Sequence, residues 1–181
     1  MRLHASPFVA VFLLAAVFGS RHAAAQQVTK PTVPGASNFA KLETTVACGG
    51  ATTPEAVPEI KKLGYTSIIN LRLPSEPGAN VEGEEAAAKA AGIKFFSIPF
   101  SGQSPDPAVA DKFLATITAP GNEPAYIHCA AGNRAGAMWM IKRMAVDHWD
   151  SEKAFSEATA LGLTSPALKQ FAIDYTQTHK R

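Results

Sequence analysis

The chain has 181 residues, 46% of them hydrophobic and 18% charged, with a formal net charge of +2 at pH 7. This length suits one domain with a substantial core, and the weak charge argues against nucleic acid or an anionic membrane as a partner, because both require a basic excess. Two cysteines are too few for a disulfide scaffold, and no Cys, His and carboxylate cluster has metal-site spacing, so we expect no metal and no other cofactor.

The first 25 residues have the pattern of a secretory signal peptide. Arg2 supplies a basic start, residues 8–18 form an uncharged apolar run, and Ala23–Ala25 form a small-residue cleavage site. The run is too short to span a bilayer well, although an uncleaved anchor is the alternative. Cleavage leaves fifteen basic and fifteen acidic residues. We therefore expect export across a bacterial inner membrane, most simply to the periplasm, with no membrane association afterwards.

Residues 26–38 are rich in proline and glycine and are predicted to be an extended linker, followed by one catalytic domain over residues 39–181. Apolar periodicity and capping residues predict strands over residues 44–47, 65–71, 93–100 and 124–127. The same signals predict helices over residues 53–63, 81–91, 108–117 and 137–146, and two more that start near residues 150 and 165.

Strands that alternate with helices in this way predict an α/β fold, in three α/β/α layers around a mostly parallel sheet of four to five strands. Ligands bind such sheets beyond the carboxyl ends of the strands. Cys129, Arg72 and the loop over residues 101–106 all follow predicted strands. We therefore expect them to converge at one edge of the sheet.

The stretch from His128 to Gly136 reads His-Cys-Ala-Ala-Gly-Asn-Arg-Ala-Gly, between a predicted strand and a predicted helix. A helix start favours negative charge, which should lower the pKa of the Cys129 thiol. The backbone N–H groups of the loop, with the guanidinium of Arg134, could then bind a tetrahedral oxyanion. The loop residues that would supply these groups are Ala130, Ala131, Gly132 and Asn133.

This stretch resembles the signature of cysteine-dependent protein phosphatases of the dual-specificity type, in which a His-Cys pair ends a strand and a glycine-containing loop leads to an arginine. The segment Gly64-Tyr65-Thr66-Ser67-Ile68-Ile69-Asn70-Leu71-Arg72, after a helix that begins at Thr53, resembles the start of those domains. The resemblance is strongest to the bacterial branch named for a phosphatase-like domain of beta-lactamase-hydrolase-like proteins, and it runs from about Phe39 to about Trp149.

The resemblance implies a dual-specificity-phosphatase-like fold and hydrolysis of a phosphomonoester through a cysteinyl-phosphate on Cys129. It also implies a general acid in the loop before residue 107, where Asp106 is the best candidate, although Asp106 is equally suited to cap the next helix. Substrates of this class are small phosphoesters or phosphoproteins. The sequence does not indicate an oligomeric state.

The loop also departs from that signature. Four residues separate Cys129 from Arg134, one fewer than in the common phosphatase loop, and position 135 is alanine. Rhodanese-like sulfurtransferases are similar in using a short loop, so a persulfide-forming enzyme with a sulfane-sulfur substrate is the first alternative. A catalytically silent oxyanion-binding module is the second.

Three further residues have two interpretations each. His128 should point away from the pocket, because side chains alternate along a strand, and brace the loop from behind. Arg72 could bind substrate or could pair with Glu76 or Glu82. Cys48 could be an inert strand residue or a reversible disulfide partner of Cys129 in an oxidising compartment.

Overall fold

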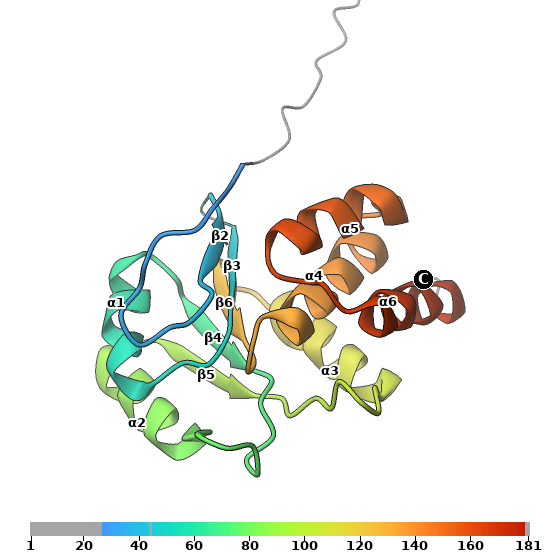
Figure 1. Cartoon of the computed structure of the whole chain (residues 1–181). Coiled ribbons are helices and arrows are strands. Elements are labelled where there is room, and N and C mark those ends of the chain that lie inside the picture. The colour runs from blue at the N-terminus through green and yellow to red at the C-terminus, as the bar shows by residue number, and fades with distance from the viewer. Residues whose placement is uncertain (1–26, 44, 180–181) are drawn as a thin grey trace, which may run out of the picture.

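The computed structural model describes residues 27–43 and 45–179, so the predicted signal peptide lies outside the described residues. A central sheet has six strands in the order β1-β2-β3-β6-β4-β5 (Figure 1). The strands are β1 (Val28–Thr29), β2 (Ala40–Leu42), β3 (Val46–Gly49), β4 (Ser67–Asn70), β5 (Lys94–Ser97) and β6 (Ala125–His128). Strands β3, β6, β4 and β5 are parallel, whereas β1 and β2 are antiparallel additions at one edge.

Helices cover both faces of this sheet, which confirms the three-layer α/β prediction. A short 3₁₀ turn (Pro54–Ala56), α1 (Val57–Lys62) and α2 (Val81–Ala91) pack on one face, and α3 (Pro107–Ile117) and α4 (Asn133–Ala145) lie on the other (Figure 1). Helices α5 (Ser151–Ala160) and α6 (Pro166–Thr178) pack against α4. The predicted limits of α2 agree with the structure, because Asn80 caps its start and Gly92 ends it with a φ of 65°.

Each face of the sheet has its own apolar core. Tyr126 and Ile68 pack against the α1 and α2 layer, and Ile127 and Ile69 pack against the α3 and α4 layer. Neighbouring residues of a strand point to opposite faces, so both central strands are buried on both sides. This explains the adjacent apolar residues at the centre of β4 and β6, and it makes the strand that ends at His128 a rigid support.

Residues 28–38 are part of this domain, whereas the sequence predicted a linker. Val28 and Thr29 pair with β2, Val33 and Ala36 are buried, and the backbone N–H of Ser37 donates to the carbonyl of Ala51 over 2.9 Å. The prolines keep the backbone extended, as predicted, and that extended segment completes one wall of the domain.

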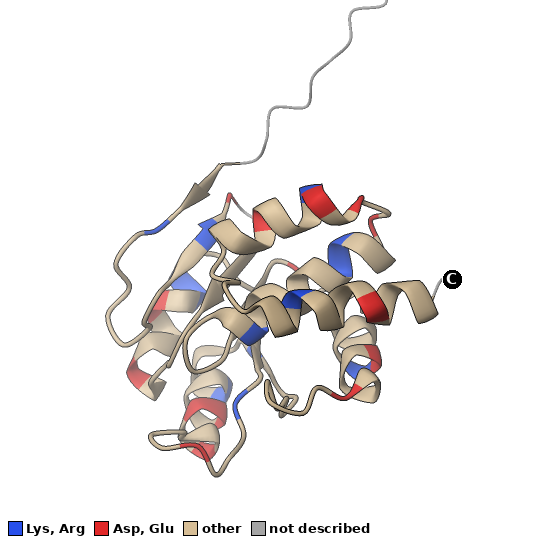
Figure 2. Ribbon diagram, turned by 45° about the vertical axis from the view of Figure 1, so that its right-hand side comes forward, with Lys and Arg blue, Asp and Glu red and all other residues tan. Residues whose placement is uncertain are grey.

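Charged residues of both signs are interspersed along the helices of both layers (Figure 2). Within residues 27–43 and 45–179, no helix is long and apolar enough to cross a membrane.

Candidate active site

Strand β6 carries Cys129 to the carboxyl edge of the sheet, as predicted. The strand lies between β3 and β4, and the backbone N–H of Cys129 still donates to the carbonyl of Gly49 over 3.2 Å. Cys129 is 1% exposed and packs with the α3 and α4 layer. The strand pairing on both sides therefore fixes the position of the thiol.

The loop after Cys129 turns its peptide N–H groups toward the sulfur. The carbonyl of Ala130 accepts from Ala51 N over 2.9 Å, and that of Ala131 accepts from Asn38 Nδ2 over 3.3 Å. In a trans peptide the N–H points opposite to the carbonyl, so the Ala131 carbonyl that bonds to Asn38 leaves the N–H of Gly132 on the other side of the loop. The N–H of Gly132 indeed lies 3.2 Å from Cys129 Sγ.

Gly132 makes this short loop feasible. Its φ of 101° lies in the left-handed region that side chains disfavour, and it is the N-cap of α4. Helix α4 consequently begins at Asn133, four residues before the predicted start at Ala137. The positive end of the α4 dipole and its unpaired N–H groups therefore lie directly beside the thiol.

Asn133 fastens the loop to the connection between α5 and α6. Its side-chain oxygen accepts from Thr164 N over 2.7 Å, from Ser165 N over 2.8 Å and from Thr164 Oγ1 over 3.1 Å. Sequence reasoning had placed Asn133 in the oxyanion loop through its backbone alone. The structure adds a side-chain role, which is to hold the first turn of α4 in place.

Arg134 is held by a carboxylate that the sequence did not assign to the site. Its Nη2 donates to Glu76 Oε2 over 2.7 Å, and its Nη1 donates to the other oxygen of the same carboxylate. Nη1 also donates to the carbonyls of Phe100, at 2.8 Å, and Leu71, at 3.2 Å. This two-pronged pairing gives the guanidinium one orientation at the carboxyl edge of the sheet.

The charges of Glu76, Arg134 and Arg72 stabilise one another. Hydrogen bonding by Arg134 lowers the pKa of Glu76 to about 2, with a smaller contribution from Arg72. Burial alone would lower the pKa of Arg134, but Glu76 and Cys129 together raise it above its ordinary value. Glu76 is therefore ionised at neutral pH, and Arg134 carries its charge next to the nucleophile.

Arg72 takes the second of its two predicted roles, as a partner of Glu76. Its Nε lies 3.4 Å from Glu76 Oε2, and its Nη1 and Nη2 donate to the carbonyls of Gly78 and Pro77 over 2.9 and 2.6 Å. The side chain is almost fully buried. Arg72 thus shapes the loop that presents Glu76 to Arg134, and direct substrate binding by Arg72 stays a prediction.

His128 points to the opposite face of the sheet from Cys129, as predicted. Its ring is fully buried and stacks on Tyr126, with centroids 5.5 Å apart. Nε2 lies 2.9 Å from Oε2 of Glu84, a fully buried carboxylate of α2. Glu84 could not be recognised from the sequence, because residues 81–91 have the pattern of an ordinary charged, alanine-rich helix.

Asp106 lies at the end of the loop that follows β5. Its Oδ1 accepts from Ala108 N over 2.9 Å, so the residue caps α3, and its side chain is exposed. The same loop touches the site at its other end, because a Cβ added to Gly102 would lie 3.5 Å from Arg134 Cγ. The cap is a structural fact, and the general-acid role stays a prediction.

Cys48 and Cys129 are both free thiols. Cys48 pairs in register with Ile127, and a strand spacing of ~4.8 Å with a rise of ~3.3 Å per residue places the Cα atoms of the two cysteines about 8 Å apart. A disulfide needs about 7 Å or less. Burial, and then the nearby Cys129, raises the pKa of Cys48 well above its ordinary value. This geometry favours the inert interpretation.

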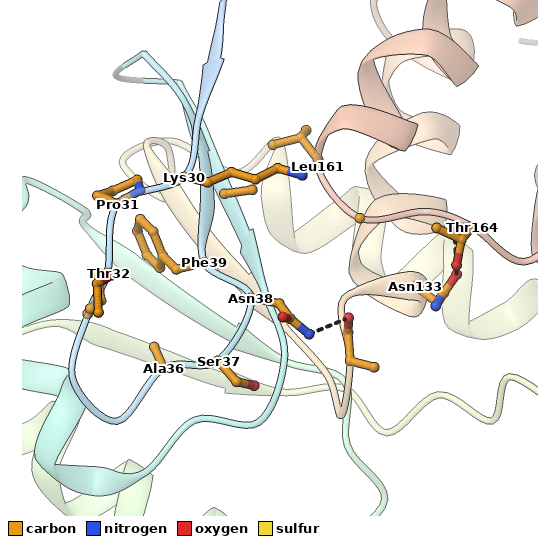
Figure 3. Close-up of a pocket in the computed structure, with 14 residues that line it drawn as sticks. Lys30, Pro31, Thr32, Ala36, Ser37, Asn38, Phe39, Asn133, Leu161 and Thr164 are labelled. Carbon is orange, nitrogen blue, oxygen red and sulfur yellow. Dashed lines mark hydrogen bonds between the residues drawn. The ribbon is translucent and has the colours of Figure 1, made fainter.

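A groove of about 590 Å³ lies beside the loop (Figure 3). Ala131 and Asn133 of the loop form one part of its wall, the N-terminal segment with Lys30 and Asn38 forms another, and Thr164 lies across from that segment. Lys30 is the only charged residue among the described residues that line it. The groove is therefore polar at its rim and carries a positive charge.

A buried cysteine at a strand end, a backbone N–H on its sulfur and a fixed arginine in the first turn of the next helix define a cysteine-centred oxyanion site of the phosphatase type. A family model described as "DSP-PTPase phosphatase fused to NAD+ Kinase" matches residues 20–174. The chain belongs to this family of cysteine-dependent, dual-specificity-type phosphatases.

Solved structures with this fold agree. The core catalytic domain of the PP-IP phosphatase SIW14 from S. cerevisiae, in complex with citrate, is 22% identical, with a TM-score of 0.65 over 82% of this chain and 91% of that chain. TpbA from P. aeruginosa, in complex with pTyr, is 19% identical, with a TM-score of 0.59 over 90% and 91%. A DUF442 protein from Shewanella putrefaciens CN-32 is 17% identical, with a TM-score of 0.67 over 81% and 96%. Comparison with the curated proteins finds no matching sequence.

Proposed function

We propose that this chain is an exported phosphatase that hydrolyses a phosphomonoester through a cysteinyl-phosphate on Cys129. The observation that carries the proposal is the contact between Gly132 N–H and Cys129 Sγ, in a loop that ends at an arginine fixed by Glu76. Donors that already point at a sulfur also point at the oxygens of a phosphoryl group attached to it. Such fixed donors stabilise the charge of the transition state without having to reorient.

In this mechanism the Cys129 thiolate attacks phosphorus in line with the leaving oxygen, and an S–P bond forms as the P–O bond breaks. Loop N–H groups and Arg134 hold the three remaining oxygens. Asp106 gives its proton to the leaving oxygen, and the resulting carboxylate then takes a proton from water as that water attacks phosphorus. Inorganic phosphate leaves and the thiolate returns. The Asp106 oxygen that does not cap α3 is the one proposed to carry the proton.

The substrate that we propose is a small or side-chain phosphoester. TpbA binds pTyr, and SIW14 is a PP-IP phosphatase. In this chain, Ala131 and Asn133 of the loop line a groove with room for an organic group of that size, although Cys129 and Arg134 are not among its lining residues. Lys30 in its wall favours an anionic group over a cationic one. Export to the periplasm is supported by the pattern of residues 1–25 and would put substrates outside the cytosol within reach.

The deciding experiment compares purified mature protein with Cys129→Ser and, as a matched control, Cys48→Ala. Turnover of p-nitrophenyl phosphate should disappear in the first variant and persist in the second. Thiosulfate-to-cyanide sulfur transfer, measured in parallel, tests the alternative suggested by the short loop. Sulfur transfer without phosphatase activity would refute the proposal, and the absence of both reactions would favour a silent oxyanion-binding module.

A further inference from the structure

Glu84 is a carboxylate in the interior of the domain, on the opposite face of the sheet from the Cys129 thiol. Its side chain has no exposed surface, and within the described residues its Oε1 has no hydrogen-bond partner. A buried carboxyl group with an unpaired oxygen costs free energy, and replacing buried polar groups by apolar residues often stabilises a protein. Stability therefore does not explain why a carboxylate occupies position 84. The contacts of Glu84 suggest a role at the active site instead.

The first contact leads to the nucleophile. Glu84 Oε2 lies 2.9 Å from Nε2 of His128, an ion-pair contact if the ring is protonated, and within the described residues the two ring nitrogens have no hydrogen bond beyond that contact. The His128 ring also stacks on Tyr126. The Glu84 carboxylate is therefore the polar group that sets the orientation of the ring within that stack. Because His128 directly precedes Cys129, the ring that Glu84 contacts belongs to the residue next to the nucleophile.

The second contact leads to the arginine. Asn70 Nδ2 donates to Glu84 Oε2 over 3.3 Å, and Asn70 Oδ1 accepts from the backbone N–H of Arg72 over 2.7 Å. The Arg72 side chain then bonds to the loop over residues 76–78, where Glu76 holds Arg134. An unbroken series of polar contacts therefore runs from Glu84 to the guanidinium at the mouth of the site.

We propose that Glu84 is a positioning residue for both halves of the active site, holding Cys129 through His128 and Arg134 through Asn70, Arg72 and Glu76. Glu84 itself lies on the opposite face of the sheet from Cys129. The expected effect of Glu84 on turnover rests on the proposed function. The expected effect of Glu84 on the positions of the thiol and the guanidinium does not. A chemical readout of those two groups therefore tests it without any turnover.

The test measures the alkylation of Cys129 by iodoacetamide, alone and with increasing inorganic phosphate. The rate without phosphate reports on the thiol, and the phosphate concentration that halves the rate reports on Arg134 and the loop. Glu84→Gln should slow alkylation and raise the half-protecting concentration, each several-fold, whereas the exposed neighbour variant Glu85→Gln should match the wild type in both. If the protein turns over p-nitrophenyl phosphate, Glu84→Gln should lower kcat by about 10- to 100-fold and change KM less.

Two further variants distinguish the route through His128 to Cys129 from the route through Asn70 to Arg134. They also replace Glu84→Gln if near-ultraviolet circular dichroism shows that this variant does not fold. Asn70→Ala removes the link from Glu84 to Arg72 and leaves Glu84 and His128 themselves unchanged, so it should raise the half-protecting phosphate concentration much more than it slows the rate without phosphate. His128→Asn should mainly slow alkylation. The proposal is overturned if Glu84→Gln behaves as Glu85→Gln does, or if Asn70→Ala and His128→Asn affect both readouts equally. Loss of turnover in the wild type, with these alkylation differences intact, would refute the proposed function and not the role of Glu84.

Discussion

Replacing Glu76 by glutamine tests whether Arg134 must be held by a charged partner. In the wild type the carboxylate binds both terminal nitrogens of the guanidinium and accepts from the backbone N–H of Leu73 over 2.9 Å. Glutamine keeps the size and one oxygen but removes the charge and half of the two-pronged pairing. Arg134 should then populate other orientations and meet the phosphoryl oxygens less often.

The structure sets the size of the effect. A pKa lowered to about 2 from an ordinary value near 4.5 corresponds to about 3 kcal/mol of stabilisation of the ionised form. Partial solvent exposure of Glu76 reduces this to about 1–2 kcal/mol. For catalysis, a misplacement of the arginine on the order of 1 Å costs about 100-fold in rate. Glu76→Gln should therefore lower kcat/KM far more than it lowers stability.

The sign of the pH dependence follows from the same values. Because the pKa of Glu76 is lower in the folded chain than in the unfolded one, its stabilisation is present above pH 4.5 and is lost as the pH falls from 4.5 toward 2. Urea unfolding at pH 7 and at pH 3 measures this. The stability difference between wild type and Glu76→Gln should be clear at pH 7 and smaller at pH 3.

The assay is steady-state hydrolysis of p-nitrophenyl phosphate beside those unfolding curves, with Glu82→Gln as the matched control. Glu82 is an exposed acid near the start of α2, and its variant should keep wild-type activity and stability. Wild-type kcat/KM in Glu76→Gln would refute the reasoning, because it would mean that Arg134 either needs no fixed partner or plays no part in the reaction.

Three other variants test neighbouring parts of the site. Asp106→Asn should slow hydrolysis of alkyl phosphates, which have poor leaving groups, more than that of p-nitrophenyl phosphate, and an equal small effect on both would leave Asp106 as a helix cap only. Asn133→Ala removes the acceptor of two backbone N–H groups and should cost about 1–2 kcal/mol of unfolding free energy, which Asn133→Asp should largely restore. Thiol counting under non-reducing native conditions should find Cys48 and Cys129 both free, and a protected pair would contradict the strand register.

The sequence predicted the layers of the fold because its signals were local. Alternating strand and helix runs, the cap at Asn80 and the stop at Gly92 determine each element without reference to distant residues. The sequence also predicted the part of the candidate site that one contiguous stretch supplies, from His128 through Arg134. Strands β1 and β2 and the packing of residues 28–38 were missed. Residues 28–38 were missed because a proline-rich extended segment has the same sequence pattern whether it is free or docked.

The carboxylates at the site were harder to predict. Glu76 lies 58 positions before Arg134 and sits in a loop that composition marks only as a turn. Glu84 belongs to a helix whose acidic residues otherwise face solvent. A long-range ion pair leaves no periodic signal in one sequence, so the sequence indicated Cys129 and Arg134 but not the residues that orient them.

The loop that is one residue shorter also has a physical consequence for charge. Arg134 lies in the first turn of α4, where the helix dipole disfavours a cation unless an anion is nearby. Glu76 supplies that anion, but it also bonds to Arg72, so one carboxylate is shared between two guanidinium groups. The three groups together keep one net positive charge, to which the N–H groups of the loop add. In the proposed mechanism, that surplus faces the oxygens of a phosphoryl group bound to Cys129. A shorter loop can therefore still bind a tetrahedral oxyanion, provided that Arg72 keeps Glu76 from neutralising Arg134 completely.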